Sequence, residues 1–165
     1  MQMDFFRISD TLRISEDEIE ALCVNDTLPV RRYVTESKEQ EKCFATFSIS
    51  RGAVRCVIIN VRGEAFLTRN YPKFYFQRLD HPEFFRTDSG CYINKKHIAQ
   101  ILEEKNSTYR RMFDRKKKEN SFLDLSRGRA IGRYLIMTSG MVYACHSFRD
   151  ASKAEERKDS DDEQE

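Results

Sequence analysis

The chain of 165 residues lacks the features that mark several protein classes. No apolar run approaches the roughly 20 residues that a helix needs to cross a bilayer. The N-terminal segment MQMDFFRIS has no apolar core of the kind found in signal peptides. We therefore expect a cytoplasmic protein that does not associate with membranes.

Motifs of catalysis and of metal binding are also missing. The sequence has no glycine-rich phosphate loop, no GxSxG and no HExxH. Its histidines, His81, His97 and His146, are dispersed, and none stands at metal-ligand spacing to another histidine or to a cysteine pair. Cys145 precedes His146, but neighbours in a strand point to opposite faces. We therefore expect no enzymatic activity, no metal and no cofactor.

Cysteine pairs are absent as well. The five cysteines, Cys23, Cys43, Cys56, Cys91 and Cys145, stand at wide spacings without a CxxC pair. An odd number without a secretory signal favours reduced thiols. Cys91 and Cys145 lie in apolar alternation, where cysteine acts as a small hydrophobic residue. These patterns favour structural packing over redox chemistry.

Composition and charge indicate one soluble domain with a polar end. Apolar residues make up 39% of the chain and charged residues 34%, and the net charge is +2. The charge is uneven: residues 105–133 hold ten Lys or Arg against three acids, whereas residues 155–165 hold seven acids and two bases. We expect a domain over residues 1–150 and a disordered acidic tail over residues 151–165.

Alternating apolar residues predict a mainly β protein. Strand patterns occupy residues 5–14, 43–50, 54–61, 64–69, 134–137 and 141–145, and the last two form a hairpin. Pro72 predicts a short helix within residues 70–79. Ser15 followed by Glu18 has the form of a capping box, which predicts a helical turn that continues to Leu22.

The stretch FFRTDSGCYINKKHIAQI, residues 84–101, is the most informative part of the chain. An aromatic pair leads through a polar corner with a glycine into a second alternating run. Two strands joined by such a corner place Arg86 at the rim of a sheet. The rim of a sheet is a suitable place for contacts with a partner.

This stretch resembles the signature of the LytTR family of bacterial DNA-binding domains. The residues that carry the resemblance are Phe84, Phe85, Arg86, Tyr92, Ile93, Asn94 and Ile98. EAFLTRNYPKFYFQRLDHPEFFR and YLIMTSGMVYACHSFRD are similar to further family segments. The resemblance implies an elongated antiparallel β fold with one short helix after the third strand, a basic helical insertion over about 103–132, and another insertion over about 25–42.

The resemblance also implies a transcriptional regulator that contacts double-stranded DNA through loops at one edge of the β fold. Arg149, Arg86 and Arg55 are the candidate contacts, with Ser89 and Ser147 adding hydrogen bonds. Asp88 stands where the family often has a histidine, and phosphate repels a carboxylate. The alternative is therefore a diverged LytTR-like module that binds proteins. Family members often bind DNA in pairs, which implies a homodimer on DNA, although no heptad pattern is present.

The 103–132 segment supplies a second candidate surface. Tyr109, Met112 and Phe113 stand at helical spacing, which predicts an amphipathic basic helix. Its cations are Arg110, Arg111, Arg115, Lys116, Lys117 and Lys118. They are either solvated, or they contact DNA phosphates as an arm, or they bind a protein partner.

Overall fold

The computed structural model describes residues 5–7, 13–24, 54–80, 82–103, 110–119 and 121–154. The expected insertion at 25–42, the expected strand at 43–50 and residues 155–165 of the acidic tail lie outside these ranges. The prediction of a mainly β protein is confirmed, because two sheets and a small two-stranded ribbon carry the fold. Within the described ranges, no helix has the length and apolar character needed to cross a membrane.

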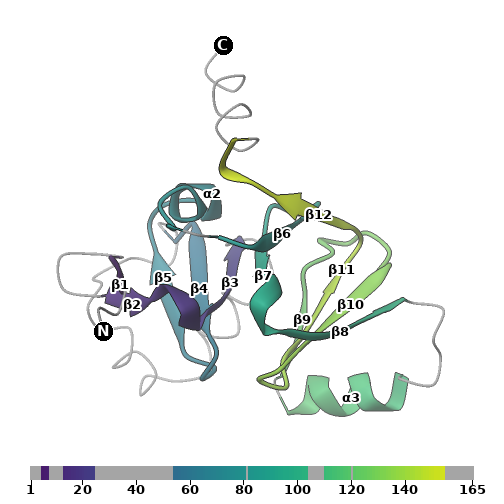
Figure 1. Ribbon diagram of the computed structural model, residues 1–165. Coiled ribbons are helices and arrows are strands. Elements are labelled where there is room, and N and C mark those ends of the chain that lie inside the picture. The colour runs from purple at the N-terminus through teal and green to yellow at the C-terminus, as the bar shows by residue number, and fades with distance from the viewer. Residues whose placement is uncertain are drawn as a thin grey trace.

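A six-stranded antiparallel sheet forms one half of the molecule (Figure 1). Its order is β12 (Phe148–Ala151), β6 (Phe84–Thr87), β7 (Tyr92–Asn94), β3 (Ile19–Val24), β4 (Cys56–Asn60) and β5 (Ala65–Thr68). Every residue of β4 is buried, which agrees with its continuous apolar sequence. The helix α2 (Pro72–Phe76) packs on this sheet, where Phe76 stacks on Tyr92 at 4.5 Å between ring centroids. The strands at 54–61 and 64–69 and the short helix were therefore predicted correctly.

A four-stranded sheet forms the other half. Its order is β8 (Ile98–Glu103), β10 (Arg133–Met137), β11 (Val142–Cys145) and β9 (Phe122–Asp124). The predicted hairpin is present as β10 and β11. However, β9 pairs with β11 in parallel, so the expectation of an entirely antiparallel fold is wrong. A three-residue strand within a basic segment offers too little apolar pattern to be recognised.

The helix α3 (Arg110–Lys118) packs against the four-stranded sheet. Phe113 is buried and stacks on Tyr134, with 4.1 Å between the ring centroids. The amphipathic helix predicted for the 103–132 segment is thus confirmed. It contributes to a small hydrophobic cluster together with Leu102, Val142 and Ala144.

The helical turn predicted to continue to Leu22 is wrong. A 3-10 turn, η1 (Glu16–Glu18), ends directly in β3, and the Ser15 side chain makes no capping hydrogen bond. Residues 19–23 are buried between β4 and β7, so strand pairing and burial outweigh the local helical signal. Before the turn, β1 (Phe5–Arg7) and β2 (Arg13–Ser15) pair as the predicted N-terminal strands.

The two sheets share a hydrophobic core, and a buried carboxylate connects them. Glu20 is the extra residue of a β-bulge in β3, because Ile19 and Ala21 pair with the adjacent residues Asn60 and Ile59. Its carboxylate accepts hydrogen bonds from the hydroxyl of Tyr143 in β11, at 2.6 Å, and from Ser139 in the β10–β11 turn. Burial raises the pKa of Glu20, although these two hydrogen bonds lower it in part.

Candidate functional site

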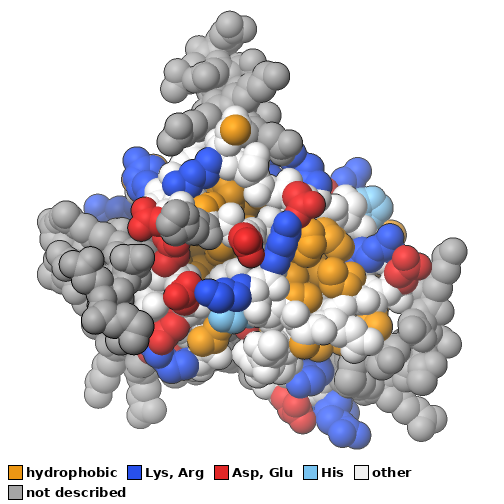
Figure 2. All heavy atoms as spheres, viewed as in Figure 1, with side chains coloured by type: hydrophobic (Ala, Val, Ile, Leu, Met, Phe, Trp, Pro, Cys, Tyr) orange, Lys and Arg blue, Asp and Glu red, His pale blue; other side chains and the backbone are white. Residues whose placement is uncertain are grey.

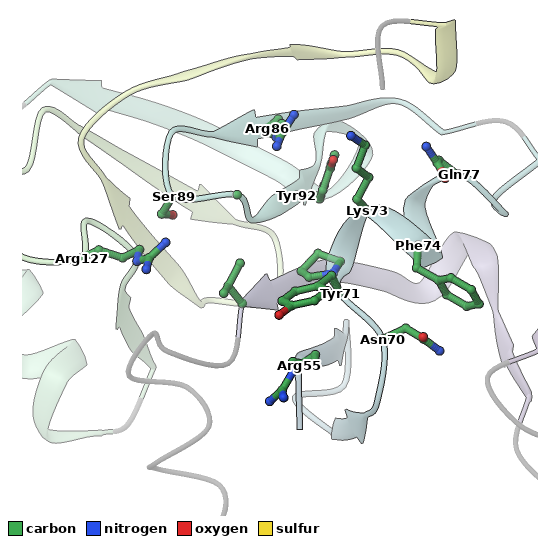
Figure 3. Close-up of a pocket in the computed structure, with 13 residues that line it drawn as sticks. Arg55, Asn70, Tyr71, Lys73, Phe74, Gln77, Arg86, Ser89, Tyr92 and Arg127 are labelled. Atoms are coloured by element: carbon green, nitrogen blue, oxygen red, sulfur yellow. The ribbon is translucent and has the colours of Figure 1, made fainter. Parts of the chain in front are cut away.

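A cavity of about 770 Å³ opens between α2, the β6–β7 turn and the loop that follows β9 (Figure 3). Its lining residues come from five separate segments of the chain. They are Val24, Arg55, Asn70, Tyr71, Pro72, Lys73, Phe74, Gln77, Arg86, Ser89, Gly90, Tyr92 and Arg127.

Charge of one sign distinguishes this cavity. Among the described lining residues, four are Lys or Arg and none is Asp or Glu. On the face shown in Figure 2, by contrast, acidic and basic side chains are interspersed. A concave surface lined by cations alone focuses a positive potential, so it favours an anionic ligand.

Strand pairing and neighbouring rings position two of the four cations. Arg86 in β6 stands opposite Tyr92 in β7, and its guanidinium lies 5.7 Å from the Tyr92 ring centroid. Arg55 directly precedes β4, where its backbone amide donates to the Thr68 carbonyl at 2.9 Å. The Arg55 guanidinium lies 6.0 Å from the ring centroid of Tyr71. Both arginines are therefore attached to rigid parts of the six-stranded sheet.

Arg127 reaches the cavity from the other half of the molecule. It adopts a left-handed backbone conformation, with φ 54°, and Gly128 follows with φ 83°. Such a conformation is strained for a residue with a side chain. Asp124 anchors this loop by accepting hydrogen bonds from the Ser126 backbone amide, at 2.9 Å, and from the Ser126 hydroxyl, at 2.6 Å. The loop thus holds Arg127 beside the cavity despite the strain.

A second recess, of about 320 Å³, adjoins the first because Arg86 lines both. Its other lining residues are Thr87, Asp88, Ser147, Phe148 and Arg149. Arg149 in β12 is the direct cross-strand partner of Arg86 in β6. Strand pairing thus places these two arginines side by side. We call the cations of the two hollows, namely Arg55, Lys73, Arg86, Arg127 and Arg149, the basic surface.

The structure thus brings together the three arginines singled out in the sequence, since Arg86 shares one hollow with Arg55 and the other with Arg149. The two serines have structural contacts as well. The Ser89 hydroxyl is buried and lies 2.8 Å from that of Thr87, within the β6–β7 turn. The Ser147 backbone amide donates to Asp88 at 3.3 Å.

Asp88 connects three segments of the chain around the two hollows. Its carboxylate forms an ion pair with Arg129 at 2.7 Å, and its backbone amide donates to the Ser147 carbonyl at 3.0 Å. These contacts join the β6–β7 turn to the loop of Arg127 and to the start of β12. Because Arg129 compensates the carboxylate, Asp88 repels an anion less than the sequence suggested.

No described side chain of the basic helix α3 lines either hollow. Figure 1 shows this helix at the end of the four-stranded sheet that is remote from α2 and β12. Lys116 donates to the Gly140 carbonyl at 2.8 Å, and the Lys117 ammonium lies 5.0 Å from the ring centroid of Phe122. Arg115 and Lys118 are exposed, and the side chains of Arg110 and Arg111 lie outside the described part of the structure.

Three residues of the site were missed in the sequence. Arg127 lies in SRGRAIGR, which reads as a connector, although an Arg-Gly pair is a signal for a left-handed turn. Lys73 and Tyr71 lie at the start of the predicted helix, where sequence alone does not show which side chains face a cavity. Their importance depends on α2 packing next to β6 and β7.

The described cysteines are thiols in the protein interior, and the hydrogen bond from Cys23 lowers the pKa of Cys91. Cys23, Cys56, Cys91 and Cys145 are buried and free. Burial raises the pKa of Cys56 and raises that of Cys145 to about 12, which keeps both thiols protonated and weakly nucleophilic. In the described ranges, no group of three or more His, Cys, Asp or Glu side chains is arranged to hold a metal ion.

Comparison with known proteins corrects the family resemblance. Residues 84–147 match a family model described as RemA-like, extracellular matrix regulatory protein A-like. No curated protein matches the chain. The family match spans β6 to β11 and includes the FFRTDSGCYIN stretch, so the LytTR resemblance and the LytTR-type regulator or module inferred from it are wrong. Over less than half of its length, the chain is similar to the RemA-like family.

Proposed function

We propose that this protein is a non-catalytic regulator that binds double-stranded DNA through its basic surface. The observation that carries the proposal is the lining of the larger cavity, where the described residues include four cations from separate segments of the chain. The description of the matching family names a regulatory protein, which supports a regulatory role. This surface includes the three arginines singled out in the sequence, and it supports DNA binding independently of the LytTR resemblance.

The chemistry of DNA fits such a surface. Cations near phosphates supply most of the affinity for DNA, and arginine binds phosphate with two parallel hydrogen bonds. Arg86 and Arg149 are cross-strand partners, and the other cations of the basic surface line the larger cavity with Arg86. Strands, the helix α2 and a short anchored loop hold the backbones of these residues, so that binding has to order only their side chains.

A salt titration with matched variants tests the proposal. We expect the full chain to retard a DNA duplex in a gel at low salt, with an affinity that falls as salt is added. Arg86→Ala and Arg149→Ala should each weaken binding about tenfold, the effect of about 1.4 kcal/mol. Arg62→Ala is the control, because Arg62 pairs with Glu18 and Glu64 outside both hollows.

Two results would contradict the proposal: absence of retardation of any duplex at low salt, or equal losses in the Arg62 control and the two variants. The homodimer on DNA and a protein partner for α3 remain predictions. Analytical ultracentrifugation of the protein with and without duplex tests the first, and a pull-down with α3 variants tests the second.

A further inference from the structure

We propose that the larger cavity binds a nucleotide, with its base stacked on the ring of Tyr71 and its phosphate held by Arg86 and Arg127. This inference rests on the proposed function in that both use Arg86. It goes further because it assigns a ligand class to the cavity itself, which shares Arg86 and Arg127 with the proposed duplex contacts.

The size of the cavity favours a small organic ligand. Sites for small molecules are typically clefts of roughly 300 to 1,000 Å³, lined by apolar groups and a few polar ones. The volume of about 770 Å³ lies within this range. The cavity is therefore large enough for a nucleotide.

Tyr71 supplies a ring on which a base can stack. Tyr71 is 61% exposed, and in the described part of the chain Ile101 is the only other large apolar residue that is exposed. Figure 3 shows the ring at the centre of the cavity, between Arg55 and the cations on the other side. The backbone of Tyr71 caps α2 and precedes Pro72, which limits its freedom. An exposed ring beside cations is the usual arrangement for stacking with a nucleic-acid base.

Arg86, Arg127 and Lys73 come from three separate elements and line one cavity. The Arg127 backbone is strained, and such strain persists where the surrounding structure imposes it, often at ligand sites. These cations match the charge of one or more phosphates.

Neutral polar groups complete the match to a nucleotide. Asn70 and Gln77, which carry amide side chains, also line the cavity. An amide carries both donors and acceptors, so it can pair with the edge of a base. A cavity for inorganic phosphate alone would need neither the ring nor the amides.

Isothermal titration calorimetry with the full chain tests the inference. The probes are ATP, inorganic triphosphate and a single-stranded thymidylate oligonucleotide. We expect ATP to bind more tightly than triphosphate. Tyr71→Ala should weaken ATP binding about tenfold, as the loss of one base stack predicts. Tyr71→Phe should restore the binding, and Ile101→Ala, the control for an exposed apolar residue, should not change it. Arg127→Ala should weaken ATP and triphosphate binding alike.

The probes also distinguish the source of the nucleotide. Binding of ATP supports a free nucleotide as the ligand, whereas binding of the oligonucleotide without ATP supports a nucleotide within a strand. In either case the Tyr71→Ala loss must appear. Failure of both probes to bind would overturn the inference, as would equal binding of ATP and triphosphate or an unchanged affinity in Tyr71→Ala.

Failure of the inference is separable from failure of the proposed function. If Tyr71→Ala loses the nucleotide but still binds a duplex, both statements hold. If the nucleotide binds and no duplex does, the inference stands and the proposed function fails. Thermal unfolding of Tyr71→Ala checks that the variant folds, which the exposure of Tyr71 leads us to expect.

Discussion

The protein has two basic regions, and they differ in how their charges are arranged. In α3, six cations lie within nine consecutive residues. In the basic surface, five cations come from parts of the chain as far apart as Arg55 and Arg149. The first region is prominent in the sequence, and the second becomes apparent only after folding.

The contacts of the two regions show why a dense run of cations in the sequence is a poor guide to a binding surface. Side chains radiate outward from a helix axis, so the described cations of α3 project from a convex surface and line neither hollow. Lys116 also bonds to Gly140, and Lys117 lies over the Phe122 ring. The cations of the basic surface, in contrast, line two adjoining hollows that share Arg86. Convergence in space, rather than the number of charges, distinguishes a candidate binding surface.

The largest effect should be the loss of stability on removal of Phe113, the buried side chain that anchors α3. Phe113→Ala takes a buried ring from its stack on Tyr134, which should lower the free energy of unfolding by about 3 to 5 kcal/mol. Urea unfolding measures this loss. Lys118→Ala, at an exposed position of the same helix, should change stability by less than about 0.5 kcal/mol. Similar effects of the two substitutions would show that α3 does not act through packing.

A smaller effect, on the salt dependence of duplex binding, should show which of the two basic regions contacts DNA. The negative slope of log affinity against log salt should become less steep by about one unit in Arg86→Ala. It should become less steep by the same amount in Arg127→Ala, because each substitution removes one phosphate contact. Arg115→Ala and Lys118→Ala in α3 should leave the slope nearly unchanged. Fluorescence anisotropy with a labelled duplex measures these slopes. A larger decrease for the α3 variants would reverse the comparison.

The smallest effect concerns the buried junction between the two sheets. Because burial raises the pKa of Glu20 above its usual 4.5, the folded protein binds this proton more tightly than the unfolded chain. The contribution of Glu20 is therefore most favourable below about pH 4.5 and is lost as the pH rises through the folded pKa. Glu20→Gln removes this titration, so the melting temperature should depend less on pH.

Melting curves of both proteins between about pH 4 and pH 7 test this expectation. Near neutral pH, the melting temperature of Glu20→Gln should be lowered least, or raised most, relative to that of the natural chain. Parallel curves would mean that Glu20 does not titrate with a raised pKa. If Glu20→Gln also changed duplex affinity, the two halves would not act independently.

The fold was predictable where the local sequence pattern agreed with the tertiary structure around it. The hairpin of β10 and β11, the pair β6 and β7, and the helix at Pro72 follow from local apolar alternation and turn residues. The capping pattern at Ser15 failed because β3 is buried between two strands distant in sequence. The family resemblance failed because short alternating strands joined by polar turns occur in many β proteins, so such a pattern does not identify one family.

For this protein, the sequence alone determined a mainly β fold and identified Arg55, Arg86 and Arg149 as candidate contacts. Only the tertiary structure decided that these arginines share one surface, that Arg127, Lys73 and Tyr71 belong with two of them, and that Asp88 is paired with Arg129. The physical reason is the range of the interactions. Alternation and turn preference act between neighbours in the chain, whereas a cavity depends on how distant elements pack against each other.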